Sequence, residues 1–299
     1  MKVAIDAMGG DYAPREIVRG AVQSAEEFPG DSFILVGDEK KIKKVLGKTR
    51  LKNIDVVHTD EYVRMEDNPT TALKSKKKAS VVIAANMVKS KECDALISAG
   101  NTGALLQVGL LNIGRIKGIR RPALLTYLPT KRKNQNQCVL LDAGANADCR
   151  PEYLIQFARM GNIYMKLVKG IEKPRVGLMN IGEEVGKGNV FYRQIYEELK
   201  NDNLINFVGN VEPRALIMGH VDVAVADGFV GNLVLKSLEA AAEFMQGILR
   251  EEIKKSIVAK VAALTMKPIF RNMKKRLDHS EYGGALLLGL DGIVVKSHG

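Results

Sequence analysis

Tryptophan is absent from this chain, and cysteine and histidine are rare, with three and four residues among 299. The cysteines Cys93, Cys138 and Cys149 show neither paired nor CxxC spacing, which argues against a disulfide framework and a cysteine-rich zinc site. Aromatic residues make up only 5% of the chain, and no nucleic-acid reading module is recognisable. We therefore expect a reducing, cytoplasmic setting and no nucleic-acid partner.

Long hydrophobic runs are also missing. No apolar stretch reaches the roughly 18 to 20 residues that a membrane-spanning helix needs. The chain passes from Met1-Lys2 directly into the apolar run that starts at Val3, which leaves no room for a signal peptide. The sequence predicts a soluble protein that is peripheral to a membrane at most.

The common catalytic motifs are absent as well. The sequence contains no GxxxxGK[ST] phosphate loop, no GxGxxG with an acidic ribose ligand, no HExxH metal motif and no GxSxG nucleophile elbow. Its four histidines offer few bases for a catalytic triad. We therefore expect no nucleotide cofactor, no catalytic metal and no covalent protein nucleophile.

Apolar runs and amphipathic stretches alternate along the chain, and 46% of its residues are hydrophobic. This alternation predicts an α/β sandwich with a largely parallel sheet. The predicted strands are Val3–Ile5, Phe33–Val36, Ile54–Val57, Ala95–Ile97, Ala123–Leu128, Cys138–Leu141, Val176–Ile181, Ile205–Val208, Val221–Ala226 and Ile293–Val295. The clearest predicted helices are Pro14–Phe28, Ala79–Lys89, Pro151–Lys169 and Phe191–Lys200.

No linker composition divides the chain, so we expect residues 1–299 to form one catalytic domain or two closely joined lobes. A long amphipathic helix is predicted from Leu233 to about Ile257, opening a helical arm at about 233–279. Between Arg250 and Arg276 nine basic residues face two acidic ones. An apolar tip with a basic collar is typical of a peripheral membrane anchor, and the alternative is a dimerisation arm. The tip residues are Val258, Val261, Leu264, Met266, Ile269 and Phe270.

The formal net charge of +11 bears on partners more than on fold. It suits an acidic protein or substrate, or an anionic membrane surface. For any single cluster the alternative is a solvated lysine face. The basic clusters are Lys40–Arg50, Lys74–Lys78, Arg115–Arg121, Lys131–Lys133 and Arg250–Arg276.

Short segments rich in glycine, asparagine and aspartate follow most of the predicted strands. The carboxyl ends of parallel strands line the ligand crevice of an open sheet, and glycine lets backbone N–H groups approach an anion closely. The pattern therefore predicts a phosphate-binding cradle. The segments are Asp6–Asp11, Ser98–Gly103, Asp142–Asn146, Asn180–Asn189, Asp227–Asn232 and Glu281–Gly284.

Two positive side chains are candidates for the same site. Lys187 lies in a glycine-rich turn, where the alternative is a solvated loop lysine, and His298 lies near the chain end, where the alternative is a disordered terminal residue. Asparagines at strand ends can bond a phosphate or carbonyl oxygen, although each one alone is more often a turn residue. The asparagines are Asn101, Asn146, Asn180, Asn189 and Asn232.

Nine segments carry a family resemblance that spans nearly the whole chain in order. They are IDAMGGDYAP (5–14), SAGNTGA (98–104), LPT (128–130), LDAGAN (141–146), NIGEE with GKGN (180–189), GNVE (209–212), DGFVGN (227–232), EYGGA (281–285) and KSHG (296–299). With these segments the chain strongly resembles the bacterial phosphate acyltransferases of phospholipid synthesis, the acyl-carrier-protein:phosphate transacylase family often called PlsX.

The resemblance implies a three-layer αβα sandwich, similar to the isocitrate/isopropylmalate dehydrogenase and phosphotransacetylase architecture, with a protruding helical arm. It implies that inorganic phosphate attacks the thioester of long-chain acyl carrier protein, with no cofactor. Our hypothesis is that Lys187, His298 and Asn232 are the catalytic residues. Such a site must position phosphate and stabilise an oxyanion. The expected substrate-binding residues are Gly9, Gly10, Asp11, Ser98, Gly100, Asn101, Thr102, Gly103, Asn146, Asn180, Gly188, Asn189, Asp227, Gly228, Gly283 and Gly284.

The sequence departs from the family pattern at a few positions. Lys74 stands where the family usually has arginine, so any anion contact there lacks the bidentate guanidinium. Val230 replaces a common threonine, Leu286 a frequent proline, and Ala79-Ser80 a pair of serines. Relatives continue with a short helix beyond His298, so we expect the terminus to be truncated.

The resemblance also implies the partners: acyl carrier protein, inorganic phosphate, a second copy of the chain, and a glycerol-3-phosphate acyltransferase at the inner face of the membrane. One alternative is a short-chain phosphotransacylase acting on acyl-CoA. Another is a membrane-bound scaffold without activity. Metal-dependent β-decarboxylating dehydrogenases share the architecture, but their aspartate cluster and nicotinamide site are not evident in the sequence.

Overall fold

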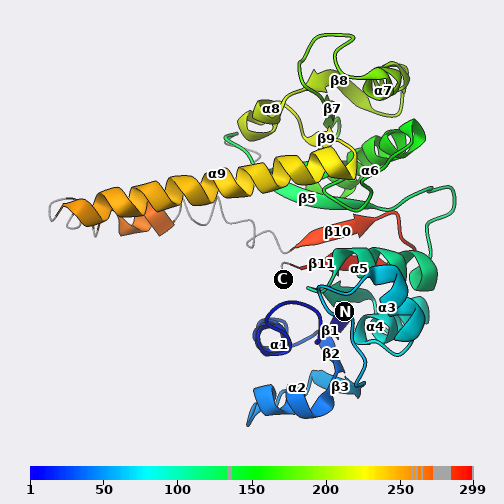
Figure 1. Cartoon of the computed structure of the whole chain (residues 1–299), viewed down its shortest axis with the longest axis vertical. Coiled ribbons are helices and arrows are strands. Elements are labelled where there is room, and N and C mark those ends of the chain that lie inside the picture. Colours follow the sequence, from blue (N-terminus) through cyan, green and yellow to red (C-terminus); the bar gives the residue numbers. More distant parts are fainter. Residues whose placement is uncertain (133–136, 257–258, 260–261, 264, 272–283, 298–299) are drawn as a thin grey trace. The chain divides into compact units, whose positions relative to one another are not determined.

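The computed structural model describes residues 1–132, 137–256, 259, 262–263, 265–271 and 284–297. Backbone contacts divide the chain into two compact units. Unit 1 comprises Met1–Leu124 and Gly284–Gly299, and unit 2 comprises Leu125–Gly283. The chain thus leaves unit 1 near Leu124 and returns to it with its last two strands (Figure 1).

Unit 1 is built on a mostly parallel sheet with the strand order β3-β2-β1-β4-β11-β10. Only β10 and β11 pair in antiparallel fashion. The strands are β1 (Lys2–Asp6), β2 (Ser32–Gly37), β3 (Ile54–His58), β4 (Ala95–Ser98), β10 (Ala285–Leu288) and β11 (Ile293–Lys296). The helices are α1 (Arg15–Glu27), α2 (Glu39–Leu46), α3 (Pro69–Ser75), α4 (Ser80–Lys89), α5 (Thr102–Val108) and the π-helical turn η1 (Gly109–Ile113).

Side-chain alternation along the strands of unit 1 creates two apolar faces. Val3 and Phe33 face a cluster that includes Val18 of α1 and Ile42 of α2, all of them buried. The helix α4 packs on β1, β2 and β4, and Figure 1 shows it on the side of the sheet opposite α1. Both faces of β1, β2 and β4 are therefore covered, which is why these strands are short, mostly apolar runs. The edge strand β3 is less buried, and its Asp55 and His58 are exposed.

Unit 2 contains the strand order β5-β6-β9-β7-β8, in which only the β5–β6 pair is antiparallel. Its strands are β5 (Ala123–Pro129), β6 (Gln137–Leu141), β7 (Arg175–Met179), β8 (Asn206–Val211) and β9 (Val223–Val225). Its helices are α6 (Pro151–Lys169), α7 (Val190–Lys200), α8 (Pro213–Met218) and α9 (Gly228–Lys255). The helix α6 packs on β6, β7 and β9, and the small Gly161 lets it approach Val223 closely.

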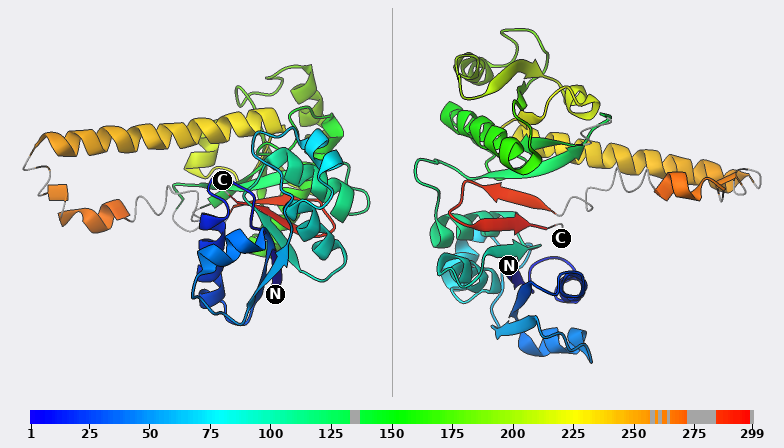
Figure 2. Two further views of the ribbon diagram at one scale, coloured as in Figure 1. Left: turned by 60° about the horizontal axis from the view of Figure 1, so that its bottom comes forward. Right: turned by 180° about the vertical axis from the view of Figure 1, so that it is seen from behind.

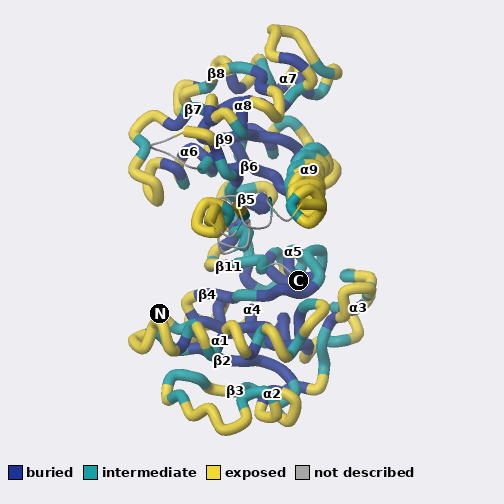
Figure 3. The backbone as a smooth tube through the Cα atoms, turned by 90° about the vertical axis from the view of Figure 1, so that its left-hand side faces the viewer, coloured by how far each residue is buried: buried dark blue, intermediate teal, exposed yellow. Residues whose placement is uncertain are grey.

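The long helix α9 has 28 residues, of which only Gly228 and Gly231 are buried. In Figure 1 and both views of Figure 2 it extends well beyond the sheet of unit 2. Figure 3 shows most strands as largely buried and most of α9 as intermediate or exposed. Large apolar side chains such as Phe244 (67% exposed) and Met245 (66% exposed) lie on its surface.

Most of the predicted elements are confirmed, including every predicted strand, although several boundaries differ. β7 ends at Met179 instead of Ile181, β8 continues to Val211, and β9 is limited to Val223–Val225. The predicted turn at Asp227–Asn232 is wrong in part, because Asp227 caps α9 and the helix begins at Gly228, five residues before the predicted start at Leu233. The strand β10 and the short helices α2, α3, α5 and α8 were not among the predicted elements.

Within the described part of the chain, no helix has the length and apolar character needed to cross a bilayer. Of the predicted tip residues, Val258, Val261 and Leu264 lie outside the described residues. Met266 and Ile269 are described and exposed, and Phe270 is half-buried.

Candidate active site

The small-residue segments of each unit collect at one edge of its sheet. In unit 1 the strands β1, β4 and β11 are parallel, so the segments after Asp6, Ser98 and Lys296 leave the sheet at the same edge. In unit 2 the parallel strands β6, β9 and β7 place the segments 142–146, 227–232 and 180–189 together in the same way. The arrangement within each unit agrees with the expectation from the sequence.

The carboxylate of Asp6 organises the site edge of unit 1. This residue is only 3% exposed. Its Oδ1 accepts a hydrogen bond from Ser80 Oγ at 2.6 Å, and its Oδ2 accepts one from Ser98 Oγ at 2.7 Å. Burial raises the pKa of Asp6, although the hydrogen bonds from the two serines oppose this rise. Asp6 thus ties the ends of β1 and β4 to the start of α4.

Two glycine backbones meet directly above this carboxylate. A Cβ atom on Gly9 would overlap the Asp6 carboxylate and lie 2.8 Å from the amide nitrogen of Gly100. The Gly100 N–H donates to Ser98 Oγ at 3.1 Å. The backbone N–H of Ser297 bonds Ser98 O at 2.9 Å, and Lys296 Nζ donates to Ala99 O at 3.2 Å. The loop after β4 is therefore held by the loop after β1 on one side and by the end of β11 on the other.

A second buried carboxylate, Asp142, organises the site edge of unit 2. Its Oδ1 accepts from the N–H groups of Gly144 and Ala145 at 3.1 and 2.9 Å. Its Oδ2 accepts from the N–H and the side-chain amide of Asn146, both at 2.7 Å. The backbone N–H groups of this loop thus donate to the carboxylate of Asp142, which fixes the conformation of the loop without a ligand.

The amino-terminal turn of α9 packs directly onto this loop. Gly228 N donates to Asn146 O at 2.7 Å, and a Cβ on Gly231 would overlap the carbonyl oxygen of Asp142. Asp227 caps the helix by accepting from Val230 N at 2.8 Å, and its other oxygen accepts from the Tyr192 hydroxyl at 2.6 Å. Burial, together with this hydrogen bond, raises the pKa of Tyr192. The first turn of α9 is thus joined to the helix α7.

Lys187 lies on the loop that leads into α7. Asn180 fixes this loop by donating to Lys187 O at 3.1 Å, and Asn210 fixes it by donating to Glu184 O at 2.9 Å. The Lys187 ammonium group is 3.5 Å from Glu184 Oε1, and the side chain is 48% exposed. The backbone of the loop is held while the ammonium group at its surface stays accessible to a soluble anion.

The five asparagines have different roles in the structure. Asn101 and Asn189 cap α5 and α7. Asn146 and Asn180 bond Asp142 and the Lys187 loop, as described above. Asn232 is exposed in the second turn of α9, and its side chain lies against Gly144. Four of the five asparagines thus hold a helix start or a loop backbone.

Of the other predicted site residues, most lie in the same loops. Gly10 and Asp11 follow β1, and Thr102 and Gly103 lie in the first turn of α5. Gly188 directly precedes Asn189, the capping residue of α7. Gly284 directly precedes β10 and has a φ of +93°. His298 and Gly283 lie outside the described residues.

Reasoning from the sequence missed the groups that hold these loops, which are Asp6, Ser80, Asp142 and Tyr192. Two of them had a visible signal, because an aspartate directly after a buried strand and before a glycine turn begins both Asp6–Asp11 and Asp142–Asn146. Within the described ranges no group of three or more histidine, cysteine or acidic side chains is arranged to hold a metal ion.

Comparison with known proteins identifies the family. The family model described as "Fatty acid synthesis protein" matches residues 1–299. A phosphate acyltransferase of Dictyoglomus turgidum is 48% identical over 301 residues, covering all of this chain and 89% of the relative. A phosphate acyltransferase of Listeria innocua is also 48% identical, covering all of this chain and 88% of the relative.

Solved structures show the same fold at low sequence identity. A phosphotransacetylase from Streptococcus pyogenes superposes with a TM-score of 0.64 at 17% identity, covering all of this chain and 88% of that one. A phosphotransacetylase from Staphylococcus aureus gives a TM-score of 0.60 at 14% identity with the same coverage. The predicted α/β architecture is confirmed. The chain therefore belongs to the phosphate acyltransferases, a bacterial family of acyltransferase enzymes.

Proposed function

We propose that this protein transfers a long-chain acyl group from acyl carrier protein to inorganic phosphate in bacterial phospholipid synthesis. A phosphate oxygen attacks the thioester carbon, the new C–O bond forms, and the C–S bond breaks. The products are acyl phosphate and the carrier thiol, which takes up a proton. The observation that carries the proposal is the full-length similarity to phosphate acyltransferases, together with the match to a fatty acid synthesis family.

The chemistry of the loops supports this reaction. Phosphate is already an anionic nucleophile at neutral pH, so the protein has to position it and stabilise the oxyanion at the thioester carbon. The phosphate-binding residues that we assign are the Ser98–Gly103 segment and His298 within unit 1, and Lys187 within unit 2. We assign the thioester carbonyl to Asn232 and the amino-terminal turn of α9. The helix dipole supports an anion at this turn, although Gly228 and Val230 already direct their N–H groups to protein acceptors.

Replacing Lys187 by alanine tests the assignment. Loss of one preorganised donor to a developing anion typically costs about 2.7–4 kcal/mol, so we expect at least a tenfold fall in kcat or rise in the KM for phosphate. The measurement is acyl phosphate formation at varied phosphate concentration. Lys200→Ala, a change at an exposed lysine on α7, is the matched control. Unchanged phosphate kinetics would remove Lys187 from the mechanism.

A short-chain phosphotransacylase acting on acyl-CoA is the second candidate, because phosphotransacetylases share the fold. The purified protein is given palmitoyl carrier protein or acetyl-CoA with phosphate. Faster turnover of the carrier-protein thioester supports the proposed function, and faster turnover of acetyl-CoA supports the alternative. If phosphate causes no loss of the carrier-protein thioester and no loss of acetyl-CoA, both activities are contradicted and a scaffold role is favoured.

We further propose that α9 and the segment after it serve as a dimerisation arm and as a peripheral contact with the inner face of the membrane. The exposed apolar residues Phe244, Met245 and Ile248 on α9 support burial against a second copy. The positive charge between Arg250 and Arg276 supports attraction to anionic lipid. Membrane attachment would release acyl phosphate where a glycerol-3-phosphate acyltransferase consumes it.

Two acidic substitutions at the tip test the membrane contact. Met266→Glu with Ile269→Glu places charges where apolar side chains are 41% and 54% exposed. We expect this variant to lose co-sedimentation with phosphatidylglycerol vesicles while its activity in solution stays within twofold of the wild type. The control is Ile163→Glu with Leu167→Glu on α6, two apolar residues that are 53% and 81% exposed. Retained vesicle binding by the tip variant would restrict the arm to dimerisation.

A further inference from the structure

A cavity of about 390 Å³ opens at the carboxyl edge of the sheet in unit 1. Its walls come from the segment after β1 (residues 8–14), from Lys41 of α2, and from residues 62–66 after β3. Because β1, β2 and β3 are parallel, all three wall segments leave the sheet at the same edge. This is the edge at which open α/β sheets bind their ligands.

The cavity has an apolar floor and a charged rim. Met8 and Val63 are 7% and 6% exposed, and they supply buried apolar surface. Lys41 and Arg64 are exposed at the rim, where Lys41 Nζ lies 5.8 Å from the centre of the Tyr62 ring. Asp11 and Glu66 also line the cavity, so its own charge is balanced. A net attraction for an anionic partner must come from the adjoining surface.

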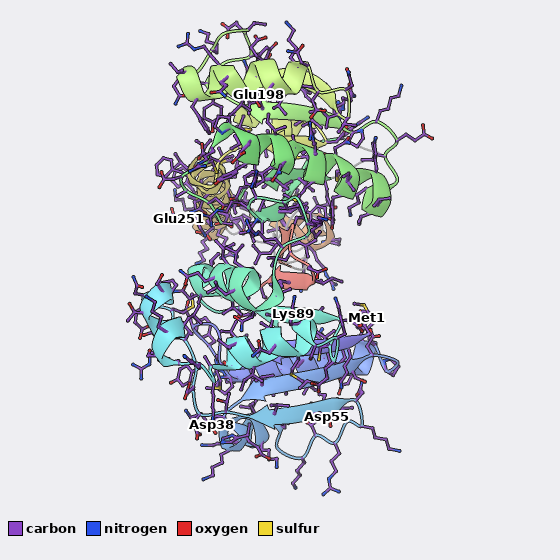
Figure 4. All side chains as sticks on the ribbon, turned by 90° about the vertical axis from the view of Figure 1, so that its right-hand side faces the viewer. Met1, Asp38, Asp55, Lys89, Glu198 and Glu251 are labelled. Atoms are coloured by element: carbon purple, nitrogen blue, oxygen red, sulfur yellow. The ribbon has the colours of Figure 1, made fainter. Side chains whose placement is uncertain are left out.

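The helix α2 provides that surface. Within Glu39–Leu46 four lysines stand against one glutamate, a balance of +3. Lys40 and Lys44 are exposed and four residues apart, so they lie on the same face of the helix. Asp38, labelled in Figure 4, caps the start of α2 and ion-pairs with Lys41. A strongly positive helix face therefore adjoins the rim of the cavity.

The inner end of the cavity reaches the loops already described. Gly10 lines the cavity, and a Cβ placed on Gly10 would lie 3.1 Å from the Ala99 Cβ. The neighbouring Gly9 meets the backbone of Gly100. A chain entering past α2 would thus arrive at the Ser98–Gly103 segment, which we assigned to phosphate.

We propose that α2 and this cavity form the docking site for the acyl donor, an acidic carrier protein with a phosphopantetheine thioester. The carrier contacts Lys40 and Lys44. The phosphate of its prosthetic group lies between Lys41 and Arg64, and the apolar part of the arm lies over Met8 and Val63. The assignment rests on the proposed function, and it selects Lys40–Arg50 among the basic clusters because this cluster adjoins a cavity that ends at the glycine loops.

Charge reversal on α2 tests the carrier contact. Electrostatic steering changes association rates by about 10- to 1000-fold, so we expect Lys40→Glu with Lys44→Glu to raise the KM for palmitoyl carrier protein at least tenfold. The KM for the same acyl group on free phosphopantetheine and the KM for phosphate should not change. Lys173→Glu with Lys200→Glu, exposed residues of unit 2, makes the same change in net charge and is expected to behave as the wild type.

The rim is tested separately with Lys41→Ala and Arg64→Ala. Each variant should raise the KM for the acyl thioester of phosphopantetheine severalfold and leave that of acyl pantetheine, which lacks the phosphate, unchanged. An unchanged carrier KM in the α2 variant, or equal effects on both small thioesters at the rim, would overturn the docking site. A wild type that does not turn over palmitoyl carrier protein would instead contradict the proposed function itself.

Discussion

Gly231→Ala is expected to abolish acyl phosphate formation and to destabilise unit 2. The added methyl group would overlap the carbonyl oxygen of Asp142 and lie 3.0 Å from its carbonyl carbon. Both atoms belong to the backbone of a loop whose N–H groups bind the Asp142 carboxylate, so neither can move without breaking those bonds. Overpacking a protein interior usually costs up to about 3 kcal/mol of stability, and we expect a cost at or above this value because the backbone here is fixed.

The same helix offers a matched control. Gly247 also lies within α9, but a Cβ at this position would meet no atom within 4 Å. Since alanine favours a helix interior over glycine by about 1 kcal/mol, Gly247→Ala should be neutral or stabilising and fully active. Urea unfolding and phosphate-dependent thioester loss are measured for both variants. Equal behaviour of the two would contradict the close contact between α9 and the Asp142 loop.

The position of Gly231 shows why the turn at Asp227–Asn232 was only partly predicted. Glycine is a poor helix former, so Gly228 and Gly231 indicated a loop at the start of the segment. In the structure Gly228 and Gly231 are helical, and glycine is needed at both positions because a larger residue would collide with the backbone of residues 142–146. Tertiary contact outweighs intrinsic propensity here, and no local pattern reveals such a contact.

The short helices were missed for a related reason. α3 has seven residues and α8 has six, too few for an apolar period to repeat clearly. Buried strands such as Cys138–Leu141 were predicted well because a continuous apolar run between polar residues and a glycine turn is a strong local signal. The strand β10 pairs with β11, but its Leu286 and Leu288 are only half-buried, and its sequence ALLL does not distinguish strand from helix.

The candidate site was likewise predicted only in part. The glycine segments mark which loops leave the strand ends, and the sequence located those of β1, β4, β6, β7 and β9. Which side chains hold the loops depends on partners distant in the chain. Ser80 is 74 residues from Asp6, and Tyr192 is 35 residues from Asp227. Only the folded sheet brings these pairs together.

Asp6→Ala should be the most damaging single change in unit 1. It would leave the buried hydroxyls of Ser80 and Ser98 without their acceptor, at a cost of about 1–3 kcal/mol for each. The Ser98–Gly103 segment would lose its anchor, so we also expect a rise of at least tenfold in the KM for phosphate. Asp55→Asn, on the exposed side of β3, controls for the loss of one carboxylate. A destabilised variant with a normal phosphate KM would limit Asp6 to a structural role.

Asp6→Asn separates the charge of the carboxyl group from its hydrogen bonds. Because burial raises the pKa of Asp6, the folded protein keeps a proton on the Asp6 carboxyl group at pH values where the unfolded chain has released it. The stability from this group is therefore complete below the ordinary carboxyl pKa of about 4 and falls as the pH rises through the raised pKa. Asparagine does not titrate.

The advantage of the wild type over Asp6→Asn in the free energy of unfolding should shrink with rising pH and then level off. Urea titrations of both proteins from about pH 4 to about pH 8 measure this difference. A difference that grows with pH would mean that the folded protein favours the carboxylate over the acid, and that the serine hydrogen bonds outweigh burial.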